Sequence, residues 1–349
     1  MQEIDVRTDV TDAVGLGEPL HTVATVFVPD ELADPPVVCF AFPGGGYSRG
    51  YFTFDMPGSS GRGEAGWHAA RGWVFVACDH LSVGESSTPA DPMRMTFENL
   101  ALANKATVEN VLGKLRTGEL GQFPGIEGAT VLGIGQSMGG CLTILQQGQH
   151  ATYDGIGVLG YSGSHTVLAV PPGSPPAPAV GLPRGINPDP ELLAQRHRMA
   201  GFAGPEATEA DLPPTTWGFH YDDVPRDIVV ADMVDYPNRR GTVPVWAAPT
   251  IPPCANQMMS AGTVAHEASL ITTPVLVAVG ERDVCPDPWM EPKAYKRSTD
   301  VTVYVCPTMS HMHNFASTRE LFWTRIHSWG AGVANMRQVA GSGSLVGAR

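Results

Sequence analysis

The chain has 349 residues, of which 43% are hydrophobic and 16% are charged, and its formal net charge is −13. This hydrophobic content can form a sizeable core, which excludes wholesale disorder. The acidic balance argues against nucleic acid and anionic membranes as partners, because both are polyanions.

The ends of the chain and its cysteines indicate the compartment. The first residues, MQEIDVRTDVTD, have neither the basic nor the apolar segment of a secretory signal. No stretch approaches the roughly 18 consecutive apolar residues that a membrane-spanning helix needs. The six cysteines lack metal-site spacing, and Cys39, Cys78 and Cys306 fall in apolar runs, so we expect buried, reduced thiols. These features predict a cytoplasmic protein without a membrane span.

Short apolar runs alternate with helical patterns over the first half of the chain. The runs have the composition of strands and lie at 22–28, 37–42, 73–79, 129–135 and 155–160. Helical spacing lies between them at 64–72 and 97–118. Strands of this length separated by helices predict a mostly parallel sheet covered by helices on both faces.

The alternation breaks after residue 161. The following segment holds a proline-rich stretch at 171–179 and two helical patterns, at 190–201 and 225–235. Strand-like runs return at 273–280 and 301–306, and an amphipathic pattern follows at 317–333. The strands on both sides of the break are needed to complete one sheet, which disfavours two separate domains joined by a proline-rich linker.

We therefore predict one α/β domain with an insertion. Its two parts are residues 1–161 and 271–336, and the insertion at 162–270 is a mainly helical cap. Residues 337–349 are predicted to be a flexible tail.

The stretch GIGQSMGG at 133–140 places a glycine two residues before and two residues after Ser137. This G-x-S-x-G spacing is typical of a nucleophilic serine on a sharp, strained turn between a strand and a helix. Residues without a β-carbon allow the two segments to approach closely there. A strand-like run precedes the motif and a helical pattern follows it, so Ser137 is the candidate nucleophile.

A nucleophilic serine needs a base, and the base needs an acid that orients it. Asp283 follows the strand-like run VLVAVG, and His311 lies in the turn after VTVYVC. Both therefore fall beyond the carboxyl ends of strands, where open α/β sheets bind ligands. His313 is an alternative base, and Asp287 is an alternative acid.

Two further segments complete a pattern. Glycines follow a strand in PGGGYS, and DHLSVGESS follows the next strand. Together with GQSMG, GERD and SHMH, these segments resemble the signature regions of α/β-hydrolase-fold serine hydrolases of the carboxylesterase-like kind. The resemblance covers about residues 20–335, with the insertion as the cap.

The resemblance implies a role for each site residue. Ser137 would be the nucleophile, His311 the general base and Asp283 the orienting acid. The backbone N–H of Met138 would donate to the oxyanion, and Gly45 or Gly46 would supply the second donor. Pro43 stands where many relatives have histidine, which leaves open which of the two glycines donates.

The resemblance also implies a reaction without metal or organic cofactor, the hydrolysis of a carboxylic ester through an acyl-enzyme. The expected substrate is hydrophobic, aliphatic or aromatic, and small to medium in size. The expected pocket walls are Trp217, Phe219, Trp246 and Ile251 from the cap and Tyr47 and Phe52 from the glycine loop. Arg49 in that loop would suit a substrate carboxylate.

Other reactions remain open at this stage. The same triad is found in other enzymes of this fold, namely thioesterases, lactonases, amidases, carbon–carbon bond hydrolases and cofactor-free haloperoxidases. A non-catalytic ligand-binding relative is a further alternative. The serine at the elbow excludes the dehalogenases and epoxide hydrolases that attack with aspartate.

Overall fold

The computed structural model describes residues 1–177, 181–185, 189–199, 212–234, 236–237, 239 and 241–346. The predicted proline-rich stretch and the predicted helix at 190–201 each extend past these ranges, so Pro178, Ala179, Ala200 and Gly201 lie outside the described residues.

Within the described residues, one sheet has the strand order β1-β2-β4-β3-β5-β6-β7-β8. The strands are β1 (Gln2–Asp9), β2 (His21–Val28), β3 (Val37–Phe42), β4 (Val74–Cys78), β5 (Thr130–Gln136), β6 (Gly155–Leu159), β7 (Val275–Arg282) and β8 (Val301–Ser310). β2 pairs antiparallel with β1 and β4, and every other pairing is parallel. The predicted mostly parallel sheet is confirmed.

The central strands are apolar because both faces of the sheet are covered. Every residue of β3, with the sequence VVCFAF, is buried. β1 was missed in the sequence, because it is an edge strand with exposed and buried residues in alternation rather than an apolar run. The predicted burial of the cysteines is confirmed, since all six thiols are free and buried.

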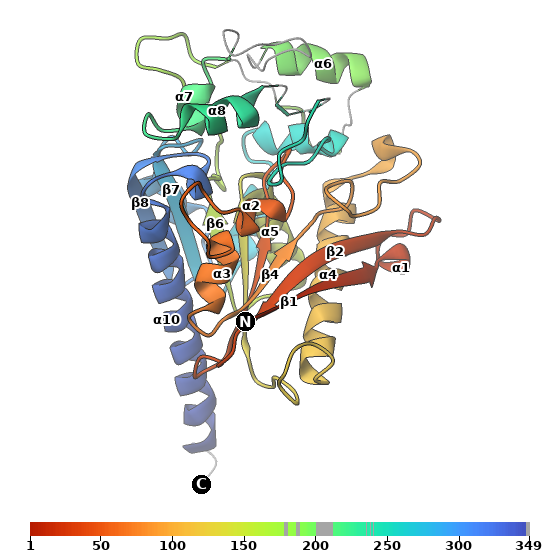
Figure 1. Ribbon diagram of the computed structural model, residues 1–349, viewed down its shortest axis with the longest axis vertical. Helices are drawn as coiled ribbons and strands as arrows, with labels where there is room; N and C mark the ends of the chain where they lie inside the picture. The colour runs from red at the N-terminus through yellow and green to blue at the C-terminus, as the bar shows by residue number, and fades with distance from the viewer. Residues whose placement is uncertain are drawn as a thin grey trace.

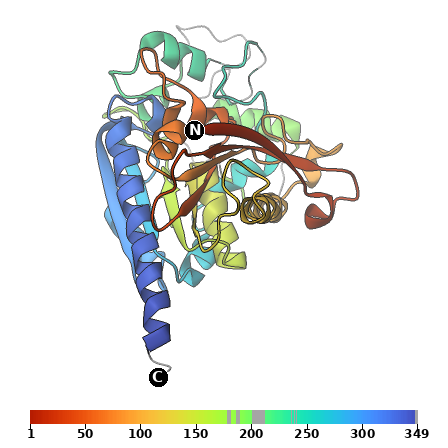
Figure 2. The same cartoon turned by 60° about the horizontal axis from the view of Figure 1, so that its bottom comes forward.

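Helices form layers on the two faces of the sheet (Figures 1 and 2). Their bounds are α1 (Thr11–Val14), α2 (Gly50–Thr53), α3 (Gly63–Ala69), α4 (Phe97–Arg116), α5 (Met138–His150), α6 (Pro190–Met199), α7 (Thr216–Phe219), α8 (Arg226–Met233), α9 (Ala265–Leu270) and α10 (Arg319–Val346). Short 3₁₀ helices are η1 (Pro92–Arg94), η3 (Pro253–Met259), η4 (Pro288–Lys293) and η5 (His313–Phe315). α4 and α5 pack with one hydrophobic cluster of the core, and α3 and α10 pack with the other.

Much of the described chain between β6 and β7 covers the end of the sheet where the parallel strands finish. α6, α7 and α8 lie at the top of Figure 1, above that end. α9 packs against α5 instead, so the last part of the predicted cap at 162–270 belongs to a helix layer of the core.

α10 continues beyond the predicted helix and into the predicted tail. It runs to Val346, where a flexible tail was predicted from residue 337. Arg337 Nη1 donates to the carbonyls of Gly128 (2.9 Å) and Ala129 (2.8 Å), which holds this part of the helix against the body of the protein. None of the helices formed by the described residues has the length and apolarity to cross a membrane.

Candidate active site

Ser137 lies at the junction of β5 and α5 in a strained backbone conformation. Its φ of 53° and ψ of −114° are unfavourable for a residue with a side chain. The surrounding chain holds it there, because its N–H donates to the Leu159 carbonyl (2.8 Å) and its carbonyl accepts from Cys141 N (3.0 Å). The predicted strand–turn–helix setting of the motif is present.

The two glycines of the motif are required by contacts between backbones. A β-carbon on Gly135 would lie 2.1 Å from the Gly139 carbonyl oxygen. A β-carbon on Gly139 would lie 2.1 Å from the Phe42 carbonyl oxygen. The Gly139 oxygen belongs to α5 and the Phe42 oxygen to the end of β3, so both are backbone atoms fixed by secondary structure, and the G-x-S-x-G spacing follows from the packing of the turn.

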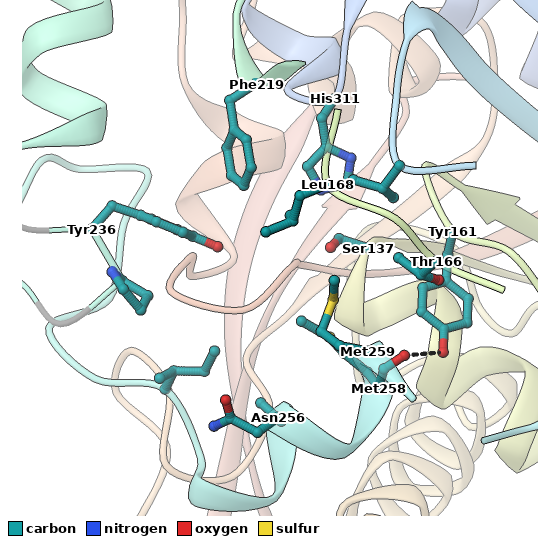
Figure 3. A pocket seen from close by; sticks show the side chains of 14 residues that line it. Ser137, Tyr161, Thr166, Leu168, Phe219, Tyr236, Asn256, Met258, Met259 and His311 are labelled. Carbon is teal, nitrogen blue, oxygen red and sulfur yellow. Dashed lines mark hydrogen bonds between the residues drawn. The ribbon is translucent and has the colours of Figure 1, made fainter. Parts of the chain in front are cut away.

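Asp283 and His311 meet beyond the ends of β7 and β8. His311 Nδ1 lies 2.7 Å from Asp283 Oδ1. His311 and Ser137 line the same pocket, and Figure 3 shows both side chains at its wall. Gln136 donates to the His311 carbonyl (3.0 Å), which helps to hold the histidine turn. The structure thus brings together the three residues that the sequence predicts.

Asp283 is held as a carboxylate by four donors. Oδ1 accepts from His311 Nδ1 and from Val284 N (2.7 Å), and Oδ2 accepts from Gly280 N and from His313 Nε2 (2.8 Å each). Burial acts to raise the pKa of Asp283, but the charges and hydrogen bonds of the two histidines bring this pKa well below its ordinary value. Asp283 therefore stays ionised at neutral pH.

The two candidate histidines contact opposite oxygens of Asp283. Only His311 is among the residues that line the pocket with Ser137. His313 is buried behind Asp283, with its ring centroid 4.3 Å from that of Phe322. The alternative acid Asp287 is exposed. The geometry favours His311 and Asp283 over the alternatives.

The carbonyls of the glycine loop after β3 are all occupied by hydrogen bonds. Each carbonyl from Pro43 to Gly46 accepts a hydrogen bond. The donors, in that order, are His80 Nε2 (3.1 Å), Tyr47 N (3.2 Å), Tyr236 Oη (3.0 Å) and Ala248 N (3.0 Å). The N–H groups of Gly45, Gly46 and Met138 donate to no protein acceptor within the described part of the chain. These N–H groups are available to a ligand.

The glycine loop is packed directly against the elbow. A β-carbon on Gly44 would lie 2.3 Å from Gln136 Oε1 and 3.2 Å from the Ser137 β-carbon. The Gly44–Gly45 peptide therefore passes beside the nucleophile. Its nitrogen belongs to Gly45, so the packing favours Gly45 over Gly46 as the second donor.

The pocket beside Ser137 is mainly apolar and spans about 620 Å³, including the part open to solvent. Its walls are Ser137, Tyr161, Thr166, Leu168, Phe219, Tyr236, Pro237, Ile251, Ala255, Asn256, Met258, Met259, Val284 and His311 (Figure 3). No aspartate, glutamate, lysine or arginine is among these walls as far as the structure describes them.

Of the six predicted pocket residues, the structure places Phe219 and Ile251 in the wall, and Phe52 is buried in the core. Tyr47 and Trp246 are buried elsewhere, where both donate to Asp232 (2.8 Å each). Trp217 packs under Arg282, whose guanidinium carbon lies 4.5 Å from the ring centroid. Tyrosine and tryptophan carry a donor that needs a partner when buried, and here a distant carboxylate supplies it.

Several wall residues were missed in the sequence. Met258 and Met259 lie at the end of η3, which brings both side chains to the pocket. Tyr236 and Asn256 were not singled out. All four lie in the insertion, where no motif marks which side chains turn toward the elbow.

Arg49 forms ion pairs with two acidic residues and is not among the described residues that line the pocket. Its guanidinium pairs with Asp79 and Glu85, and its backbone N donates to Asp79 Oδ1 (2.7 Å). The suggested contact with a substrate carboxylate is therefore wrong. Asp79 instead holds the DHLSVGES turn to the start of α2, as its position in a turn suggests.

A sequence model described as the alpha/beta hydrolase family matches residues 26–322. The chain belongs to the alpha/beta hydrolase family. No curated protein sequence matches this hydrolase at a significant level.

Solved structures similar to this alpha/beta hydrolase include a proline iminopeptidase from Mycobacterium smegmatis, with a TM-score of 0.60, 16% identity and coverage of 95% of this chain and 99% of that one. A thermophilic esterase from Thermogutta terrifontis, malate bound, has a TM-score of 0.58, 14% identity and coverage of 96% and 100%. A haloalkane dehalogenase variant from Bradyrhizobium elkanii has a TM-score of 0.57, 14% identity and coverage of 97% and 100%. At these identities the likeness concerns the fold.

A second acidic group lies buried behind the site of this hydrolase. Glu64 in α3 accepts from Asn314 Nδ2 (2.9 Å) through Oε2, whereas Oε1 has no hydrogen-bond partner and lies 3.7 Å from His68 Nε2. Burial raises the pKa of Glu64 to about 7 and lowers the pKa of His68 to about 3. His68 is therefore uncharged at neutral pH and cannot form an ion pair with Glu64.

Changing Glu64 to glutamine should stabilise the protein above pH 7. Because the pKa of Glu64 rises from 4.5 to about 7 on folding, the folded state binds more protons between these values, and stability falls as pH rises through this window. Glutamine removes this cost, which is at most about 3 kcal/mol. Urea unfolding from pH 4 to 8 measures the difference, with the exposed Glu127→Gln as the matched control. An offset that is the same at every pH would contradict the prediction.

Proposed function

We propose that this alpha/beta hydrolase is a serine hydrolase that cleaves a neutral, hydrophobic carboxylic ester of small to medium size. One observation carries the proposal. Ser137 on its strained turn and His311 line one pocket, and His311 Nδ1 is hydrogen-bonded to the buried carboxylate of Asp283. This arrangement supports Ser137 as the nucleophile, His311 as the base and Asp283 as the orienting acid.

The hydrogen bond to Asp283 selects the tautomer of His311. With its proton on Nδ1, the neutral ring has an acceptor at Nε2. This nitrogen takes the proton of Ser137 as the serine oxygen bonds to the ester carbonyl carbon. The tetrahedral intermediate then releases the alcohol, which receives that proton from His311. Water repeats the sequence: His311 takes its proton, the hydroxyl attacks the acyl-enzyme, and Ser137 leaves with the proton.

The negative charge of the tetrahedral oxygen needs donors that are already in place. We assign this role to the N–H groups of Met138 and Gly45, because neither has a protein acceptor within the described residues and both adjoin the elbow. Met138 also opens α5, where the helix dipole favours negative charge.

The composition of the pocket supports the substrate class. Leu168, Phe219, Ile251 and Val284 supply apolar contact, and the described walls hold no charged side chain apart from His311 when it is protonated. A charged ammonium or carboxylate would lose its hydration there without a partner. Neutral acyl groups are therefore favoured.

The test compares leaving groups at one acyl chain. p-Nitrophenyl esters from acetate to decanoate locate the preferred chain length, and the thioester and anilide of that acyl group are then measured. We expect the ester to give the highest kcat/KM. A higher value for the thioester or the anilide would overturn the ester assignment and keep the serine mechanism. Absence of labelling of Ser137 by a fluorophosphonate would overturn both.

Variants of the two histidines separate the base from its neighbour. His311→Ala should lower kcat about 10³-fold or more, since it removes the proton acceptor. His313→Gln should lower kcat by about tenfold or less, because an amide still donates to Asp283 Oδ2. Steady-state kinetics on the preferred ester measure both. The reverse order of effects would make His313 the base.

A further inference from the structure

Asp232 in α8 is a fully buried carboxylate that the proposed mechanism does not use. It accepts from four side chains. The donors are Tyr47 Oη, His220 Nε2 and Trp246 Nε1 at 2.8 Å each, and Arg239 Nη2 at 3.0 Å. Burial acts to raise the pKa of Asp232, but the hydrogen bond and charge of His220 and the charge of Arg239 bring it below the ordinary value. An ionised carboxylate therefore lies at the centre of this cluster.

Two of the donors adjoin the two halves of the candidate active site. Tyr47 directly follows Gly46 of the glycine loop. His220 directly follows α7, and the carbonyls of Gly218 and Phe219 accept from the backbone N–H groups of His311 and Met312 (2.9 Å each). One carboxylate in the insertion thus connects the glycine loop with the turn that carries His311.

Arg239 and Tyr236 extend the connection to the glycine carbonyls. Arg239 donates to the Gly46 carbonyl through Nη1 and to the Asp232 carbonyl (2.9 Å) through Nη2, and Tyr236 Oη donates to the Gly45 carbonyl (3.0 Å). Both side chains pack closely against Gly46. A β-carbon there would lie 3.1 Å from Tyr236 Cε2 and 3.3 Å from Arg239 Nη1.

These contacts determine where the loop amides point. In a trans peptide the carbonyl and the following N–H point in opposite directions. The Gly45 carbonyl, held by Tyr236, sets the direction of the Gly46 N–H. The Gly46 carbonyl, held by Arg239, directs the Tyr47 N–H to the Gly44 carbonyl, and this in turn sets the direction of the Gly45 N–H.

We propose that Asp232 is a positioning residue, which holds the glycine-loop amides and the His311 turn in the arrangement that stabilises the tetrahedral intermediate. This inference rests on the proposed serine hydrolase function. Donors that are already oriented stabilise the developing charge without reorganisation. Loss of Asp232 should therefore weaken binding of the transition state more than binding of the substrate.

Asp232→Asn keeps the size of the side chain. Trp246 and Arg239 can only donate, so the NH₂ group faces Tyr47 and His220, which must then accept instead of donating, and the charge is lost. We expect kcat for the preferred ester to fall about 10²-fold with KM within about threefold. Affinity for a trifluoromethyl ketone analogue should fall by the same factor as kcat/KM.

The control is Asp227→Asn, an exposed aspartate in the first turn of the same helix, which should leave kcat and analogue affinity unchanged. Tyr47→Phe removes one donor and keeps the ring, and it should lower kcat about tenfold. This variant tests the proposal if Asp232→Asn does not fold.

The outcomes separate this inference from the function on which it rests. A folded Asp232→Asn or Tyr47→Phe protein with normal kcat and normal analogue affinity would overturn the positioning role. So would a change in melting temperature or KM alone, since that is the signature of a purely structural role. If the wild type neither hydrolyses esters nor reacts with a fluorophosphonate, the proposed function fails, and this inference fails with it.

Discussion

Ser137→Ala should lower kcat/KM for the preferred ester by about 10³-fold or more and abolish labelling by a fluorophosphonate. The hydroxyl oxygen is the only atom lost. The β-carbon remains, so the strain at φ 53° and the backbone bonds to Leu159 and Cys141 are unchanged. We therefore expect the melting temperature to stay within a few degrees of the wild type, which makes the loss of activity a loss of chemistry.

Thr166→Ala is the matched control for Ser137→Ala. Thr166 carries the other aliphatic hydroxyl among the described pocket walls, but it does not lie on the elbow. Its removal should change KM and leave fluorophosphonate labelling intact. Comparable activity in Ser137→Ala and the wild type would rule out Ser137 as the nucleophile.

Asp283→Asn should lower kcat by about 10⁴-fold, because an amide at this position favours the wrong tautomer of His311. The carboxylate accepts four hydrogen bonds in the structure, two on each oxygen. Whichever way the asparagine turns, its NH₂ group faces one backbone N–H and one histidine. The variant should also be less stable, which urea unfolding at pH 7 measures.

The stability effect of Asp283→Asn should depend on pH. The pKa of Asp283 in the folded protein lies well below its ordinary value of 3.8, so the carboxylate stabilises the folded state above pH 3.8 and this contribution is lost as pH falls below it. Asp287→Asn, at an exposed position four residues on, should change neither kcat nor stability. Equal effects of the two variants would exclude Asp283 as the orienting acid.

Local chain geometry explains why much of the site could be predicted. A glycine two residues on either side of Ser137 is required by contacts within one strand–turn–helix unit, so the requirement is visible in a short stretch of sequence. Asp283 and His311 each follow an apolar strand directly, and parallel strands bring their carboxyl ends to the same edge of the sheet. Alternation of strands and helices is likewise local, which is why the sheet was predicted and edge strand β1 was not.

What the sequence by itself determined is therefore the sheet apart from β1, the elbow and the order of the candidate triad. The tertiary structure decided that His311 rather than His313 lines the pocket with Ser137, which residues form the other pocket walls, and which side chains bind the glycine loop. Tyr47 meets Asp232 across 185 residues of chain, and Tyr236 meets the Gly45 carbonyl across 191. Contacts of this kind leave no periodicity and no motif, because each depends on how the insertion folds back over the end of the sheet.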